Sequence, residues 1–200
     1  ATRNAAGRYW DTRFADHPTL AEMFGHAKLV APKKGAMSTG RLQRFFDPVI
    51  ANNLVMMPTS ALTLDPLHST GIAHALAGVE RLAGLLLRDR DDVAVEAYRR
   101  QVLGEARQLD LLVSLAYRCM PCFQRFTAAC MLYFAAAISS EERLASGDSA
   151  EPASETLWLA DDAQFRHAVG QASHVLTSNA DLPTVSSAVR KLLPPWNRAG

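Results

Sequence analysis

The chain changes from an extended segment to a helix within TLDPLHSTGIAH, residues 63–74. Before this stretch, residues 54–64 are an extended segment rich in Met, Leu, Val and Thr that ends in a turn at Asp65 and Pro66. A strand is predicted at 54–57, and Pro58 indicates that it is an edge strand or is broken there. After it, apolar residues recur at the spacing of a helix, at Ile72, Leu76, Val79, Ala83 and Leu86. The fold therefore divides at this point into an extended part and a helical part.

The start of the predicted helix offers a small positive pole. Ser69 or Thr70 is placed to cap it, and Gly71 leaves the first turn without a side chain, so another group can approach the backbone closely. The unpaired N–H groups of a first turn favour an anion or an electron-rich ring, such as a phosphate, a halide or the N1–C2=O edge of a flavin. Asp65 is placed to accept hydrogen bonds from sugar or ribityl hydroxyls. The plainer interpretation is an ordinary turn followed by a capped helix.

The run DPLHSTGIAHALAGVERL, residues 65–82, resembles the FAD-contacting motif in the C-terminal part of flavin-dependent tryptophan halogenases and related FAD monooxygenases. The resemblance implies that Asp65 binds the ribityl chain and that the Ser-Thr-Gly residues lie under the isoalloxazine ring. The cofactor-binding residues that it implies are Asp65, Pro66, Leu67, His68, Ser69, Thr70, Gly71 and Ile72. In halogenases proper, Thr70 and Gly71 would also line a halide site. No catalytic residue is assigned.

The sequence also departs from that family. None of the eleven glycines form the Gly-x-Gly-x-x-Gly turn that holds a dinucleotide pyrophosphate, and the halogenase signature Trp-x-Trp-x-Ile-Pro is absent. Neither Lys33 nor Lys34 has a context that matches the catalytic lysine of the halogenases. We therefore expect the chain to be the C-terminal part of a longer flavoenzyme that holds half of a cofactor site. The sequence does not separate halogenation from hydroxylation.

The predicted fold class is α+β, which the resemblance identifies as the C-terminal portion of an FAD-binding monooxygenase-like fold. Residues 1–68 are expected to form a sheet-rich segment, with strands at 28–31 and 35–46. The resemblance implies that this segment covers the substrate side of the flavin. Residues 69–200 are expected to be helical. Both parts are expected to belong to one continuous unit within a larger FAD domain.

The helical part contains several long apolar patterns. An amphipathic helix is predicted from the aspartates at 91–92 to about residue 116, followed by a break at Pro121. The segment 123–138 is apolar almost all round, which predicts a helix buried on most sides. A separate short helix is predicted to begin at Ser139, and two more are expected to be capped by Asp161 and Thr184.

Composition limits the classes of partner. A net charge of +1 does not indicate a basic surface that would bind nucleic acid. No stretch reaches the eighteen or so consecutive apolar residues that a membrane-spanning helix needs. The odd count of three cysteines favours a reducing compartment, the cytoplasm. The resemblance implies a small-molecule substrate, for which an aromatic compound is one option, and a flavin reductase as the source of electrons.

Two other constellations offer alternatives. Cys119 and Cys122 have the Cys-x-x-Cys spacing of thiol oxidoreductases, but they follow a predicted helix rather than a strand, and Cys130 makes only three thiols for a zinc site. His68 and His74 flank the helix start on different sides, so no metal site is predicted there. The rival class of function is a non-catalytic helical module that binds a partner through its amphipathic faces.

Overall fold

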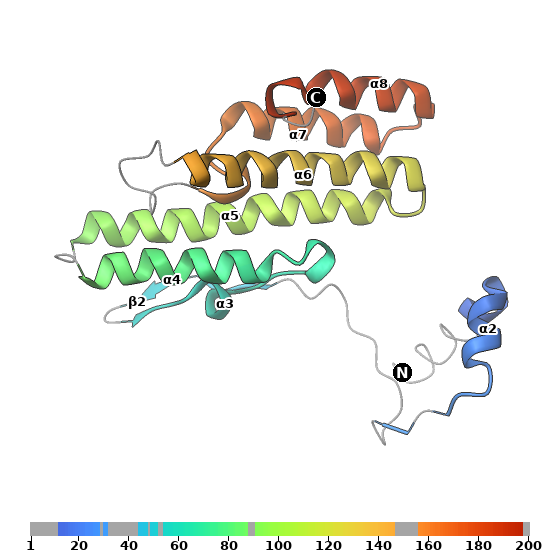
Figure 1. The fold of residues 1–200 in the computed structure, drawn as a ribbon, viewed down its shortest axis with the longest axis horizontal. Helices are drawn as coiled ribbons and strands as arrows, with labels where there is room; N and C mark the ends of the chain where they lie inside the picture. Colours follow the sequence, from blue (N-terminus) through green and yellow to red (C-terminus); the bar gives the residue numbers. More distant parts are fainter. Residues whose placement is uncertain are drawn as a thin grey trace. The chain divides into compact units, whose positions relative to one another are not determined.

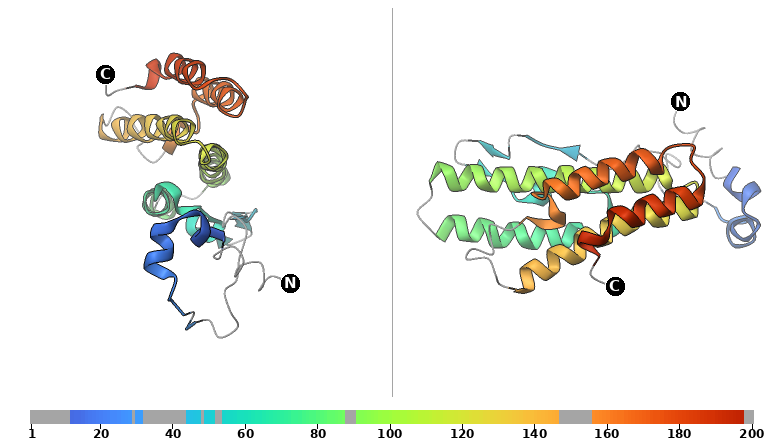
Figure 2. Two further views of the ribbon diagram at one scale, coloured as in Figure 1. Left: turned by 90° about the vertical axis from the view of Figure 1, so that its right-hand side faces the viewer. Right: turned by 90° about the horizontal axis from the view of Figure 1, so that it is seen from above.

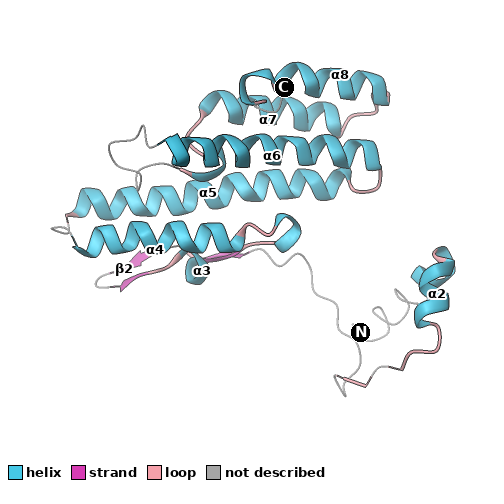
Figure 3. Ribbon diagram, in the orientation of Figure 1, coloured by secondary structure: helices cyan, strands magenta, loops and turns pink. Residues whose placement is uncertain are grey.

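A computed structural model describes residues 12–28, 30–31, 44–47, 49–51, 54–87, 91–146 and 156–197. Most of these residues are helical, and the few strands are short, so the α+β prediction is confirmed at the level of fold class (Figure 3). Contacts divide the chain into two compact units, residues 1–42 and residues 43–200.

The first unit contains the short helix α2, Pro18–Phe24, whose helical residues have no buried side chain. The strand expected at 28–31 is wrong, because the described residues 28, 30 and 31 are not in a strand. A lone extended run needs a neighbour to pair with before it becomes a strand. Most of the second expected strand, 35–46, lies outside the described residues.

The strands of the second unit form two antiparallel pairs. β1, Arg44–Phe45, pairs with β4, Leu62–Thr63. β2, Ile50–Ala51, pairs with β3, Leu54–Val55. The strand predicted at 54–57 forms at its first two residues and ends before Pro58, one of the two outcomes predicted for this proline, and a short helix then interrupts the extended segment 54–64.

That interruption is α3, Pro58–Ala61, with proline at its first position. Proline has no N–H to give to a sheet, and its fixed φ suits the first turn of a helix, so the chain leaves the strand at this residue. α3 packs against the next long helix.

The helical part is a stack of long helices (Figure 1). The helices are α4, Gly71–Leu87; α5, Asp92–Cys119; α6, Phe123–Ser146; α7, Ala163–Leu176; and α8, Leu182–Leu192. α4 packs on α5, α5 on α6, and α6 on both α7 and α8, an arrangement that Figure 2 shows from two further sides. The described residues also contain the 3₁₀ turns η1, Pro66–His68; η3, Leu157–Leu159; and η4, Pro194–Trp196.

Aspartate side chains cap three of these helices. Asp91, Asp162 and Asp181 accept hydrogen bonds from backbone N–H groups in the first turns of α5, α7 and α8. The first of these caps agrees with the sequence. The N-caps expected at Asp161 and Thr184 are wrong. The N-cap of α7 is Asp162, one residue after Asp161, and the N-cap of α8 is Asp181, three residues before Thr184.

α6 differs from its prediction in two ways. It continues without a break through Ser139 to Ser146, because Ser139 and Ser140 are buried inside the helix rather than capping a new one. It also buries only one face, since Phe123 is 76% exposed and Phe134 is 54% exposed. The buried face packs against α5, α7, α8 and η3, where the main hydrophobic core lies.

α4 confirms the predicted helix, but its apolar stripe faces outward. Ile72 is 74% exposed, and Leu76, Val79 and Leu86 are also exposed. The buried residues of α4 are His74, Gly78, Arg81 and Leu85. In the part of the chain that the structure describes, no helix is long and apolar enough to cross a membrane.

Candidate functional site at the start of helix α4

Asp65 fixes the turn that leads into α4. Its side chain is buried, and Oδ1 accepts hydrogen bonds from the backbone N–H of Leu67, at 3.1 Å, and from the hydroxyl of Tyr117, at 3.0 Å. The first bond caps η1, and the second ties the turn to α5. Asp65 is therefore a structural acceptor within this chain, and Oδ1 already has two donors.

The backbone after η1 turns sharply before the helix begins. Ser69 has φ 56°, in the left-handed region, and its N–H donates to the carbonyl of Pro66 at 3.0 Å. A serine with backbone torsion angles in the left-handed region is uncommon, and this conformation stores local strain. The carbonyl of Thr70 then accepts from the N–H of His74 at 3.1 Å, which places Thr70 at the cap position of α4.

Gly71 begins α4 with open space in front of it. A Cβ built on Gly71 would meet no atom within 4 Å, so nothing in the described chain occupies the space beside this backbone. The first N–H groups of the helix have no partner inside it. The predicted helix is thus present with Thr70 at its N-cap position by backbone geometry, and its first residue has a bare backbone edge.

Glu105 of α5 lies at the centre of a buried polar cluster behind this helix start. It is 0% exposed, and both of its oxygens accept hydrogen bonds from the guanidinium of Arg81, at 2.8 and 2.9 Å. The backbone N–H of Leu157 donates to Oε1 at 2.7 Å. A buried carboxylate is stable only with such partners, so Glu105 ties α4, α5 and η3 together.

His74 completes the cluster from the first turn of α4. Its Nε2 lies 3.0 Å from Oε2 of Glu105, which is ion-pair distance, although the alignment falls short of a regular hydrogen bond. Burial alone would raise the pKa of Glu105, but the contacts with His74 and Arg81 outweigh it and hold that pKa below its ordinary value. Glu105 is therefore a carboxylate anion at neutral pH.

His68 lies on the other side of the turn. Its ring stacks on Tyr133 of α6, with ring centroids 4.0 Å apart and an angle of 13° between the planes. Its Nε2 is buried, and no hydrogen-bond partner for it occurs among the described residues. Burial lowers the pKa of His68, and the nearby Asp65 opposes that shift only in part. His68 is accordingly a neutral ring at pH 7.

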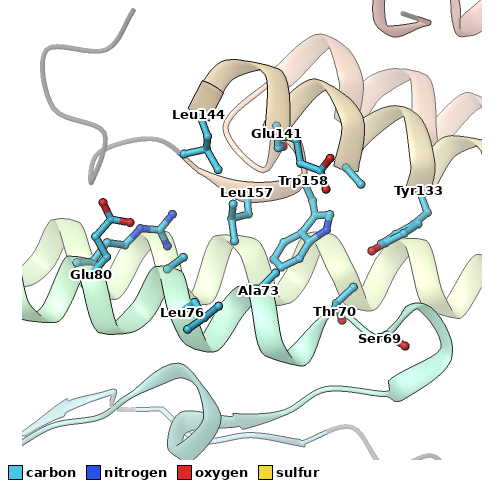
Figure 4. A pocket seen from close by; sticks show the side chains of 14 residues that line it. Ser69, Thr70, Ala73, Leu76, Glu80, Tyr133, Glu141, Leu144, Leu157 and Trp158 are labelled. Atoms are coloured by element: carbon cyan, nitrogen blue, oxygen red, sulfur yellow. The ribbon is translucent and has the colours of Figure 1, made fainter. Parts of the chain in front are cut away.

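Two pockets flank the helix start. One, of about 640 Å³, is lined by Gly71, Ile72 and the segment of β4 and η1 beside them. The other, of about 430 Å³, lies between α4, α6 and η3, with Thr70 at its floor and Trp158 and Tyr133 in its walls (Figure 4). Ser69 borders both pockets. A group bound in one pocket would thus lie beside the same turn as a group bound in the other.

The predicted site residues stay together as one segment. Residues 65–72 form the turn, η1 and the first turn of α4, as the sequence suggested. The two histidines separate, since His68 packs on Tyr133 and His74 lies beside Glu105. Within the described ranges, no group of three His, Cys, Asp or Glu side chains could hold a metal ion.

The buried Arg81–Glu105 pair is the functional candidate that sequence reasoning missed. A signal for it exists: Glu105 falls on the predicted apolar face of α5, between Val102 and Leu109. A charge at such a position needs a buried partner. The sequence could not name that partner, because Arg81 is 24 residues away on a different helix.

The cysteine pair has the surroundings of structural thiols. Cys119 is the last residue of α5 and is buried, while Cys122 precedes α6, and both are free thiols. Burial raises the pKa of Cys119, against the influence of two nearby arginines, and burial also raises the pKa of Cys130. Raised thiol pKa values disfavour the thiolate that a redox site needs.

Comparison with known proteins gives a family match. The model of a family described as tryptophan halogenase matches residues 7–122. No curated protein and no solved structure matches the chain significantly. The matched range contains the whole of residues 65–72 and Glu105, whereas Tyr133 and Trp158 lie beyond it.

Proposed function

The chain belongs to the tryptophan halogenase family, which is flavin-dependent, and we propose that it forms the C-terminal part of an FAD-dependent halogenase-like or monooxygenase-like oxidoreductase. In this proposal the start of α4 holds the isoalloxazine and ribityl parts of the flavin. The observation that carries it is the bare backbone edge at Gly71, which opens onto a pocket beside a capped helix start.

The residues present fit a flavin. The open space at Gly71 gives a flat ring access to the first-turn N–H groups of α4, which favour the charge that a flavin gains on reduction. The exposed Ile72 adds apolar surface next to that edge. Asp65 would meet a ribityl hydroxyl through Oδ2, since Oδ1 is engaged within the chain.

The chain's own part in the chemistry is to bind and orient. When bound, FAD would supply the redox chemistry of the reaction. The helix start would stabilise negative charge on the flavin edge, and a halide, if one is used, would lie against the backbone of Thr70 and Gly71. Glu105 would hold α4 in place through Arg81 and His74. The substrate would be a small molecule, with a flavin reductase as the electron source.

The outward apolar stripe of α4 supports the view that this chain is part of a larger enzyme. Ile72, Leu76, Val79 and Leu86 are exposed on a single helix, and a continuous apolar surface in water usually marks an interface. The same stripe favours the alternative, a non-catalytic helical module that binds a partner. Flavin binding separates the two, because only the first requires it.

The test uses two glycines of the same helix. Gly71→Val should abolish flavin occupancy in the whole enzyme, because the new side chain fills the space beside the helix start. Gly84→Val is the matched control, since a Cβ there also meets no atom within 4 Å and lies far from the helix start. Equal flavin content in the two variants would refute the proposal.

A further inference from the structure

A third pocket, of about 750 Å³, lies between α7 and α8 in a part of the chain that the family model does not match. α8 packs against α7, and both helices pack on α6 (Figure 1). This pocket shares no lining residue with the two pockets beside the start of α4. The proposed flavin site therefore does not account for it.

The ionisable side chains that line the third pocket are all basic and all exposed: Arg166, His167 and His174 of α7, and Lys191 of α8. No described Asp or Glu lines it. The ion pairs between described residues engage other side chains and none of these four. The pocket thus presents two full positive charges and two imidazole rings that no carboxylate of the described chain neutralises.

Arg166 is held at a position that does not favour its charge. It is the fourth residue of α7, and a cation in the first turn of a helix faces the positive end of the helix dipole. Its Nη1 donates to the carbonyl of Ala160 at 3.1 Å, which fixes the guanidinium beside the pocket. The rest of the guanidinium fork suits the oxygens of a phosphate or a carboxylate, which would offset the unfavourable charge.

Gly170 leaves the middle of the pocket open. It lies three residues after His167 and four before His174, so the three residues share one face of α7. A Cβ built on Gly170 would meet no atom within 4 Å, although glycine inside a helix costs stability relative to alanine. Three half-buried apolar side chains continue this uncharged surface: Val175, Ala188 and Leu192. The pocket therefore joins basic groups to a bare apolar surface.

We propose that this pocket binds a small organic phosphate, a phosphate monoester carried on an apolar or aromatic body. Such a monoester carries about 1.5–2 negative charges at neutral pH and has three strong acceptor oxygens. Arg166 and Lys191 supply two positive charges for it, and the rings of His167 and His174 supply further N–H donors. A carboxylate has one charge and two oxygens, so it would leave part of this set unused. The body packs on Gly170 and the apolar side chains beside it, and this binding does not depend on the proposed function.

Binding is measured with three probes that separate the charge from the body. Isothermal titration calorimetry of the 200-residue chain at neutral pH compares phenyl phosphate with benzoate and with inorganic phosphate. Phenyl phosphate should bind about tenfold or more tightly than either of the others, because only it supplies both the double charge and the apolar body. Equal or tighter binding of benzoate, equal binding of inorganic phosphate, or binding of no probe would overturn the proposal.

Neighbouring cations of α8 test the assigned charges. Lys191→Gln should weaken the binding of phenyl phosphate about tenfold, because one of the two full positive charges is lost. Arg190→Gln is the matched control, since Arg190 is an exposed cation one residue away that does not line the pocket. An unchanged affinity in Lys191→Gln, or an equal loss in the control, would refute the assignment.

A steric variant tests the pocket while it keeps every charge. Gly170→Leu should abolish the binding of phenyl phosphate, because the new side chain fills the open space on α7. Gly84→Leu is the control, since a Cβ there also meets no atom within 4 Å and Gly84 lines none of the three pockets. Circular dichroism confirms that both variants are folded. Undiminished binding in folded Gly170→Leu would place the ligand elsewhere and refute the pocket.

Discussion

Glu105 accepts two hydrogen bonds from Arg81, at 2.8 and 2.9 Å, although the two residues lie 24 positions apart on different helices. Both side chains are almost completely buried. The pair contacts the start of α4 through His74 and the wall of the second pocket through Leu157. One carboxylate thus links the two pockets beside Ser69.

Glu105→Gln should strongly destabilise the second unit. Glu105 accepts two hydrogen bonds from Arg81 and one from the Leu157 N–H, and a glutamine cannot accept all three because its NH₂ group only donates. The variant also removes the negative charge that faces the buried Arg81 guanidinium, and removing one side of a buried ion pair costs about 3–5 kcal/mol. Urea unfolding followed by circular dichroism would measure the loss. Glu96→Gln on the same helix is the control, because its ion pair with Arg99 is largely exposed and contributes less than about 1 kcal/mol. Similar losses in both variants would contradict a special role for Glu105.

The contribution of Glu105 should depend on pH in a defined direction. Its folded-state pKa lies below the ordinary value of 4.5, so its stabilisation is fully present above that pH and is lost as the pH falls through the folded-state pKa. The stability difference between the wild type and Glu105→Gln should therefore shrink as the pH falls below 4.5 towards the folded-state pKa. A constant difference over that range would show that the carboxylate charge is not what stabilises the fold.

Gly78→Ala should destabilise the contact between α4 and α3. A Cβ at Gly78 would overlap the ring of Pro58, and overpacking of this kind costs about 1–3 kcal/mol. Gly84→Ala in the same helix meets open space and should stabilise it by about 0.5–1 kcal/mol, because alanine favours a helix over glycine. Thermal unfolding of the two variants checks this, and a shift of the same sign in both would argue against the close packing of Pro58 on α4.

His68 should titrate below its ordinary value. Burial under Tyr133 lowers its pKa from 6.5, so the neutral ring persists to lower pH than in the unfolded chain. The stabilisation from neutral His68 is present above pH 6.5 and is lost as the pH falls through the folded-state pKa. NMR titration of the ring resonances, assigned with His68→Gln, measures the midpoint. A value at or above 6.5 would place the ring in solvent or against Asp65.

The long helices could be predicted from the sequence because their apolar spacing is strong and their ends carry caps or prolines. α5 begins after the aspartate cap at Asp91, and the chain breaks before Pro121 as expected. The C-terminal limit of α6 was missed, since Ser139 and Glu142 have the spacing of a capping box. In the fold the Ser139 hydroxyl instead donates to the Trp196 carbonyl, and the neighbouring Ser140 accepts from the Leu159 N–H. Local capping chemistry cannot reveal a tertiary partner.

The site shows the same division. The turn and helix start at residues 65–72 could be predicted because an Asp-Pro turn and a helical apolar spacing follow one another in sequence, whereas their role as a site came from the family resemblance. The burial of Arg81 and the exposure of Ile72 could not be predicted, because an apolar stripe does not say which face of a helix the rest of the protein covers. Trp158 and Glu141 join the site only through the packing of α6 and η3 on α4.

The most direct test of the account is the visible absorption spectrum of the natural gene product that contains this chain, recorded before and after addition of FAD. The account predicts flavin absorption that co-elutes with the protein, and its loss in Gly71→Val with retention in Gly84→Val. A wild-type protein that stays colourless after addition of FAD would contradict the claim that the start of α4 holds a flavin.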